Sequence, residues 1–157
     1  DPTPIVKIAE LFGFTVFQSK NLDSKHSGNI HINDEKCKSI NKETIIIVDK
    51  NDSLPQQRFV IAHELGHYLF DYIGSEYDCS EKAYSCPYLK DNHSGESEQI
   101  ANRFAASLLM PKNMFIKEHD AAVDVDCRKI YVIKYLSQLF QVEEASIVKR
   151  IEEVSVK

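Results

Sequence analysis

The stretch that decides the fold is His63-Glu64-Leu65-Gly66-His67. Residues four apart lie almost one above the other on a helix, so both imidazoles of this stretch can reach a single metal ion. Glu64 is rotated by about 100° from His63, which would place its carboxylate beside the ion as a general base and not as a ligand. The pattern is typical of zinc hydrolases, but it fixes only three positions. A surface helix with two histidines is the alternative, so the flanking residues must decide.

The flanking residues predict the helix that the pattern requires. Ser53 is the expected N-cap, with Pro55 in the first turn and Gln56 at the third helical position. Apolar residues follow at helical spacing, and we expect a helix from about Pro55 to about Tyr72. Gly66 costs about 1 kcal/mol relative to alanine inside a helix, so we expect it to allow close packing of a neighbouring element. A mostly apolar helix with three such polar groups needs partners for them, and a metal ion is such a partner.

A zinc site of this kind needs a third protein ligand. Phe70 and Ile73 stand where one large class of zinc peptidases has a glycine and a third histidine, which excludes that class. Asp71 lies about 12 Å along the helix axis from His63, too far for both side chains to bind one ion. We therefore expect the third ligand on a second helix.

The second helix is predicted from an apolar repeat at helical spacing between Ile100 and Leu109. Ser94 or Ser97 is expected to open it, and Pro111 follows its end. We therefore expect a helix between these serines and Pro111, with its apolar side facing the protein interior.

Glutamates near the start of this second helix are the candidate ligands. Glu98 lies within about 40° of the inward-facing positions, whereas Glu96 lies about 160° away, toward solvent. We expect Glu98 to be the third ligand and Glu96 to be a first-turn charge that suits the helix dipole, a role that is also the alternative for Glu98. Asn102, one turn further on, could orient that carboxylate or a zinc-bound histidine. The predicted catalytic and zinc-binding residues are Glu64, His63, His67 and Glu98.

Two blocks of sequence, residues 57–67 and 98–111, together resemble the ImmA/IrrE family of zinc metallopeptidases. The second block contains Ala-Asn-x-Phe-Ala-Ala-x-Leu-Leu-Met-Pro at 101–111, which is more specific to that family than the zinc motif. The resemblance extends from Ile5 to about Glu153 and is weak between residues 73 and 95. It implies that Glu98 is the third zinc ligand. It also implies a peptidase that acts on one protein partner, because family members cleave or otherwise inactivate helix-turn-helix repressors.

Composition suits one globular domain over residues 1–157, since 157 residues with 43% hydrophobic content can bury a sizeable core. We expect an N-terminal helix and sheet in 1–52, the zinc-site helices in 53–111 and a helical segment in 128–157. The net charge of −5 argues against a non-specific nucleic-acid binder.

The cellular location is predicted from what the sequence lacks and from its cysteines. No apolar run is long enough to span a membrane, and no signal peptide is visible. Cys37, Cys79, Cys86 and Cys127 are scattered and read as reduced thiols, with a disulfide or a structural metal site as the less favoured reading. These features predict a cytoplasmic protein.

The residues before the zinc helix predict the rest of the fold. A helix is expected over Pro4–Phe12, and strands are expected over Phe14–Gln18, Asn29–Asn33 and Thr44–Val48. A helix and a small mixed sheet before the zinc helix are consistent with an α+β, zincin-like core. One sheet edge in such folds commonly receives the substrate as an added strand, and Gly28–Asn33 is our candidate for that edge.

The segment Tyr72–Gly95 has no clean period, so we expect a loop or a short broken helix between the two metal-bearing helices. It could form a lid or a wall of the substrate site. Cys79, Cys86 and His93 could bind a second metal there, although their irregular spacing favours an ordinary loop. His93, Tyr88 or another tyrosine could stabilise an oxyanion in the transition state.

The C-terminal residues predict two short helices over Arg128–Val154, separated by a break at Gln141–Glu144. This helical hairpin resembles a helix-turn-helix, and its functional alternative is DNA binding. Its second helix begins with two glutamates and has only Lys149 and Arg150 as basic residues near its middle. Acidic residues at that end repel phosphate, so we favour packing or partner docking.

These patterns together predict a zinc-dependent endopeptidase. Zn²⁺ is the expected cofactor, with its fourth coordination position left for water. The expected substrate is a helix-turn-helix repressor of a bacterial or phage regulatory system, which the resemblance alone implies. The alternative is a non-proteolytic, zinc-stabilised partner that sequesters a repressor or antitoxin, for which the carboxylate of Glu64 would be dispensable. No direct contact with nucleic acid or with a membrane is expected.

Overall fold

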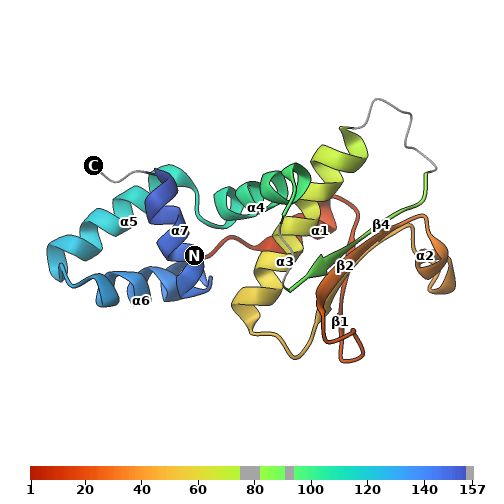
Figure 1. The fold of residues 1–157 in the computed structure, drawn as a ribbon, viewed down its shortest axis with the longest axis horizontal. Helices are drawn as coiled ribbons and strands as arrows, with labels where there is room; N and C mark the ends of the chain where they lie inside the picture. Colours follow the sequence, from red (N-terminus) through yellow and green to blue (C-terminus); the bar gives the residue numbers. More distant parts are fainter. Residues whose placement is uncertain (75–81, 91–93, 155–157) are drawn as a thin grey trace.

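The computed structural model describes residues 1–74, 82–90 and 94–154. Helices flank a small sheet, and Figure 1 shows α3 and α4 between that sheet and the C-terminal helices. The elements in chain order are α1 (Ile5–Leu11), β1 (Thr15–Ser19), β2 (His26–Ile32), α2 (Glu35–Ser39), β3 (Thr44–Asp49), α3 (Leu54–His67), the π-helix η1 (Tyr68–Ile73), β4 (Tyr84–Leu89), α4 (Glu96–Leu109), α5 (Lys112–Val125), α6 (Lys129–Phe140) and α7 (Glu144–Val154).

The sheet is mixed, as expected, with the strand order β1-β3-β2-β4. Strand β1 runs parallel to β3, whereas β2 is antiparallel to both β3 and β4. The β-branched run of β3 alternates between two buried faces: Ile46 and Val48 pack with α3 in the main core, and Ile45 and Ile47 pack with Cys37 of α2. Burial of both faces explains why this strand is a continuous apolar run.

The sequence-based choice of Gly28–Asn33 as the open edge of the sheet is wrong. These residues lie in and just after β2, which is an inner strand because Asn29 pairs with both Ile47 of β3 and Pro87 of β4. The open edge on this side belongs to β4. The segment between the metal-bearing helices is therefore not simply a loop or a broken helix, since it contains this strand.

Helix α3 begins where the sequence predicts, and it continues as a π-helix. The hydroxyl of Ser53 accepts a hydrogen bond from the amide of Gln56 at 3.1 Å, as an N-cap does. The helix lies close against the sheet because Gly28 has no side chain: a Cβ there would lie 2.4 Å from Cγ1 of Val60. The other predicted helix starts differ in detail. Gly95, with a φ of 127°, precedes α4 in place of either predicted serine.

The C-terminal residues form α6 and α7, as predicted from their apolar stripes, and α5 precedes them. Between α6 and α7, Gln141 adopts a left-handed conformation with a φ of 52°. Arg150 of α7 is buried, and its guanidinium donates hydrogen bonds to the carbonyl of Met110. Of the two basic residues of α7, only Lys149 is therefore exposed, which further disfavours phosphate binding by this helix.

Within the described residues, no helix combines the length and apolarity that crossing a lipid bilayer requires.

Candidate metal centre

Two histidines of α3 and one glutamate of α4 converge on a single point. His63 and His67 have exposed fractions of 0% and 2%, and the side chain of Glu98 is 22% exposed. The Nε2 atoms of the two histidines lie 2.9 Å apart. Oε2 of Glu98 lies 3.3 Å from Nε2 of His63, and Oε1 lies 3.1 Å from Nε2 of His67. The three predicted ligand residues are thus brought together, and they could hold a metal ion.

Gly66 is the reason that α4 can approach α3 so closely. A Cβ at this position would lie 3.0 Å from Cα of Ala101 and 3.2 Å from the ring of Phe104. Ala101 lies three residues after Glu98 on the same helix, so this contact sets the distance between Glu98 and the two histidines. The expectation that Gly66 permits close packing is confirmed.

The outer nitrogen of each imidazole is held by a side chain that fixes its tautomer. Nδ1 of His63 lies 2.9 Å from Oδ1 of Asn102, and Nδ1 of His67 lies 2.5 Å from Oδ2 of Asp71. Both oxygens accept, so each Nδ1 carries the proton and each Nε2 presents a lone pair. Ser97 donates a second hydrogen bond to the same oxygen of Asp71 at 2.5 Å. Carboxylate and amide partners of this kind commonly orient histidines that bind metals.

The donor set fits zinc. Two imidazole lone pairs and one carboxylate, all directed at one buried point, repel one another unless a cation lies between them. In a tetrahedral zinc site with bonds of about 2.0–2.1 Å, ligand atoms lie about 3.4 Å apart. The three observed separations, 2.9, 3.1 and 3.3 Å, are close to this value.

Glu64 is buried beside this donor set without a partner for its carboxylate. Its exposed fraction is 0%, and neither Oε1 nor Oε2 has a hydrogen-bond partner among the residues that the structure describes. Burial raises the pKa of this carboxyl well above its ordinary value, and the negative charge of Glu98 raises it further. A buried acid without a hydrogen-bond partner, as Glu64 is within the described part of the chain, is typical of a group that takes part in chemistry.

Strand β4 lines the other side of the centre. The ring of Tyr88 stands edge-on to the imidazole of His63, with 4.7 Å between the ring centroids. Burial raises the pKa of Tyr88 to about 12, so its hydroxyl stays protonated at neutral pH and can act as a donor. Burial also raises the pKa of the nearby Cys86 thiol to about 12, with Glu64 as the next cause. Of the residues suggested for the oxyanion, Tyr88 lies beside a candidate ligand, whereas His93 falls outside the described part of the chain.

Asp71 and Ser97 are the site residues whose role the sequence did not reveal. Asp71 was considered only as a ligand and excluded by distance, and the group of possible metal ligands indeed does not include it. The available signal was its position four residues after His67, which brings a carboxylate within reach of the outer nitrogen.

Some predicted residues do not belong to the centre or fall outside the described part of the chain. Cys37, Cys86 and Cys127 are free thiols. Cys79 and His93, suggested with Cys86 as a second metal site, lie outside the described residues. Elsewhere in residues 1–74, 82–90 and 94–154, no second group of possible metal ligands occurs.

The fold and the converging donors define a small α+β protein with a candidate metal centre between two helices. The family of IrrE N-terminal-like domains, Peptidase_M78, matches residues 9–152. The chain belongs to this peptidase family, which confirms the resemblance drawn from its two sequence blocks.

A solved structure supports the fold assignment. A Mycobacterium tuberculosis transcriptional regulator is similar to this chain with a TM-score of 0.59 and 17% sequence identity. The similarity covers 94% of this chain and 39% of that protein, so the chain spans well under half of the regulator's length. At this identity the similarity shows a shared fold alone. No curated protein matches the chain.

Proposed function

We propose that this protein is a zinc-dependent endopeptidase in which His63, His67 and Glu98 hold the metal and Glu64 is the catalytic acid–base. One observation carries the proposal: the carboxylate of Glu64 is buried without a partner beside three donors that converge on one point. Membership of a peptidase family supports a protein as the substrate.

The proposed chemistry divides between the metal and the side chains around it. Zinc, when bound, supplies a Lewis acid that polarises a peptide carbonyl and makes water a stronger acid. Glu64 takes a proton from the attacking water and delivers it to the leaving amine, a role that typically contributes about 10²–10⁴-fold to the rate. Asn102 and Asp71 hold the two imidazoles in the tautomers that direct Nε2 toward the centre. Tyr88 is our candidate for the donor that stabilises the oxyanion.

The open edge of β4 is the proposed place for the substrate backbone. This strand carries Tyr88 beside His63, so a peptide added along its edge would pass the metal centre. Pro87 lies in the same strand and has no N–H group, and proline within a sheet is found mainly in edge strands. This assignment replaces Gly28–Asn33 as the substrate edge.

The proposed substrate is a helix-turn-helix repressor of a bacterial or phage regulatory system. Its support is the family resemblance, in which such repressors are cleaved or otherwise inactivated. The alternative is a zinc-stabilised partner that sequesters a repressor or antitoxin without cleaving it, and the carboxylate of Glu64 separates the two.

The test uses the zinc-loaded chain and a helix-turn-helix repressor encoded by a neighbouring gene. Fragments are identified by mass spectrometry for the wild type, for Glu64→Gln and for the control Glu96→Gln, which removes an exposed carboxylate from α4. We expect Glu64→Gln to retain its zinc and to cleave at least about 100-fold more slowly, while Glu96→Gln cleaves like the wild type. Equal cleavage by Glu64→Gln would refute the peptidase. Repressor binding without cleavage by the wild type would favour sequestration.

A further inference from the structure

A groove adjoins the metal centre on the side of α7. Its volume is about 460 Å³, and residues of α3, α4 and α7 line it together with Tyr88 of β4. Two of the lining side chains, Tyr88 and Asn102, also contact the imidazole of His63. The volume falls in the range of about 300–1,000 Å³ that is common for ligand pockets. A peptide bound at the metal centre would have a side chain within reach of this groove.

The direction of the groove follows from helical spacing. Gln56 and Phe59 line it and precede His63 by seven and four residues, so all three side chains lie on one face of α3. On α4, Asn102 and Ala106 line the groove and are four residues apart, so they also lie on one face of their helix. The groove therefore leads from the metal centre toward the N-terminal end of α3, with α7 as its outer wall.

Arg103 and Lys149 each bring a positive charge to this groove. Both line the groove, one from α4 and one from α7, and both are exposed. Neither forms an ion pair or a side-chain hydrogen bond with any part of the chain that the structure describes.

The groove also contains two acidic residues, Glu143 and Glu153, of which only Glu153 is paired with a cation. Glu143 accepts a hydrogen bond from the hydroxyl of Ser53. Glu153 pairs with Arg150 at 3.1 Å, and Arg150 also donates to the carbonyl of Met110 at 2.9 Å. Glu153 and Arg150 cancel each other, and the hydroxyl of Ser53 leaves the negative charge of Glu143 in place, so the two cations Arg103 and Lys149 against the one anion Glu143 give the groove one net positive charge.

We propose that this groove is the subsite for the side chain of a substrate residue next to the scissile bond, and that it selects Asp or Glu. Phe59 and Ala106 offer apolar surface to the methylene groups of such a side chain, while Arg103 and Lys149 attract its carboxylate. The inference rests on the proposed peptidase function and adds the class of substrate residue.

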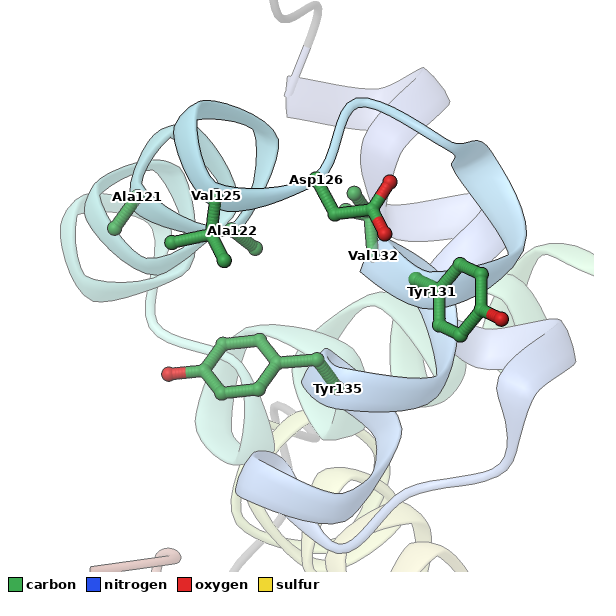
Figure 2. A pocket seen from close by; sticks show the side chains of 7 residues that line it. All are labelled: Ala121, Ala122, Val125, Asp126, Tyr131, Val132 and Tyr135. Atoms are coloured by element: carbon green, nitrogen blue, oxygen red, sulfur yellow. The ribbon is translucent and has the colours of Figure 1, made fainter.

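A second pocket, of about 410 Å³ between α5 and α6, has the opposite character (Figure 2). Its lining side chains are alanines, valines and tyrosines, and Asp126 is its charged residue. It shares no lining residue with the groove or with the metal centre, so it offers no equivalent site for an acidic side chain.

The binding test uses the zinc-loaded Glu64→Gln chain, which should hold peptides without cleaving them. The probes are two libraries of decapeptides with blocked ends, with either Asp and Glu or Lys and Arg fixed at the centre and the other positions randomised. We expect the acidic library to be retained about 3- to 10-fold better at low salt, with a smaller ratio in 0.5 M NaCl because salt screens exposed charges. Equal retention of the two libraries would overturn the proposal.

Charge-reversal variants assign the preference to the groove. Arg103→Glu with Lys149→Glu, added to Glu64→Gln, should abolish or invert the preference while zinc content and the far-ultraviolet circular dichroism spectrum stay unchanged. The matched control is Lys36→Glu with Lys38→Glu, which changes the net charge equally on exposed positions of α2. A preference that survives reversal in the groove, or that disappears in the control, contradicts the assignment.

Cleavage of the same libraries by the wild type separates this inference from the proposed function. Cleavage sites enriched in a neighbouring acidic residue support both. Cleavage without such enrichment refutes the groove and leaves the peptidase. Charge-selective binding with no cleavage of any peptide supports the groove, and the peptidase is then judged by the repressor assay alone.

Discussion

Gly66 is the position at which a single methyl group should disturb both the helix packing and the metal centre. In Gly66→Ala the new Cβ would lie 3.0 Å from Cα of Ala101, which belongs to the backbone of α4 and cannot rotate away. Carbon atoms in good contact lie about 3.5–4.0 Å apart, so α4 must move outward by a few tenths of an ångström. Glu98 and Asn102 lie on the part of α4 that has to move.

The expected magnitudes follow from this geometry. Alanine favours a helix over glycine by about 1 kcal/mol, whereas overpacking costs about 1–3 kcal/mol. We therefore expect Gly66→Ala to lower the free energy of unfolding of the zinc-free protein by about 0–2 kcal/mol. Metal ligands must keep their distances within about 0.2 Å, so the shift of Glu98 should weaken zinc binding by about 10-fold or more.

Urea unfolding of the zinc-free protein and competition with a chromogenic zinc chelator measure the two effects. The control is Ser107→Ala, which changes an exposed residue of α4, the helix that has to move, and should alter neither quantity by much. A Gly66→Ala protein that is more stable than the wild type and binds zinc equally well would refute the role assigned to this contact.

Three further predictions concern other parts of the molecule. Asp71→Asn should weaken zinc binding by about 10- to 100-fold, because it removes the carboxylate that orients His67; an unchanged dissociation constant from chelator competition would show that this contact is dispensable. Asp34→Ala should lower the free energy of unfolding by about 1 kcal/mol at pH 7, because it removes the N-cap of α2. Partial burial opposes ionisation of Asp34, but its hydrogen bonds hold its pKa below the ordinary value. This stabilisation is therefore complete above about pH 4 and is lost as the pH falls further. Urea titrations at pH 7, 5 and 3.5 should show that the difference in free energy of unfolding between the wild type and Asp34→Ala becomes smaller as the pH falls. In the zinc-free protein, the pKa of about 12 leaves roughly one Cys86 thiol in 10,000 ionised at pH 8. Iodoacetamide should therefore label the exposed Cys127 far sooner than Cys86, as followed by peptide mapping. Equal labelling rates of the two thiols would count against the burial of Cys86.

The site was predictable where helical periodicity alone decides which side chains meet. Ser53 and the apolar stripe locate α3, and the spacing of His63 and His67 brings both imidazoles to one point on it. The second helix could be oriented in the same way, because the inward face of α4 is apolar and Glu98 falls on that face. Glu98 is partly buried and Glu96 is exposed, as this orientation requires.

The sheet was less predictable because strand order depends on contacts between distant residues. Strand β4 alternates weakly and contains Pro87, so its residues did not indicate a strand. Without β4, the Gly28–Asn33 segment looked like the last strand of the sheet, although it lies in the interior. The short helix α2 was also missed, since five residues are too few to show a helical period.

Contacts between side chains of different elements were beyond the reach of sequence patterns. Ser97 of α4 donates a hydrogen bond to Asp71 of η1, and Asp71 in turn accepts a hydrogen bond from Nδ1 of His67. The spacing of Asp71 excluded it as a ligand, but only the packing of the two helices shows that it supports one. The groove beside the centre is a similar case, because its cations come from α4 and α7.

The most direct test of the metal centre is X-ray diffraction from crystals of the zinc-loaded protein at wavelengths on either side of the zinc absorption edge. We expect one anomalous peak per chain, between Nε2 of His63, Nε2 of His67 and the carboxylate of Glu98, with Glu64 beside it and not bound to it. A peak held by other residues, or no peak in crystals whose protein contains zinc in solution, would contradict the proposed metal centre.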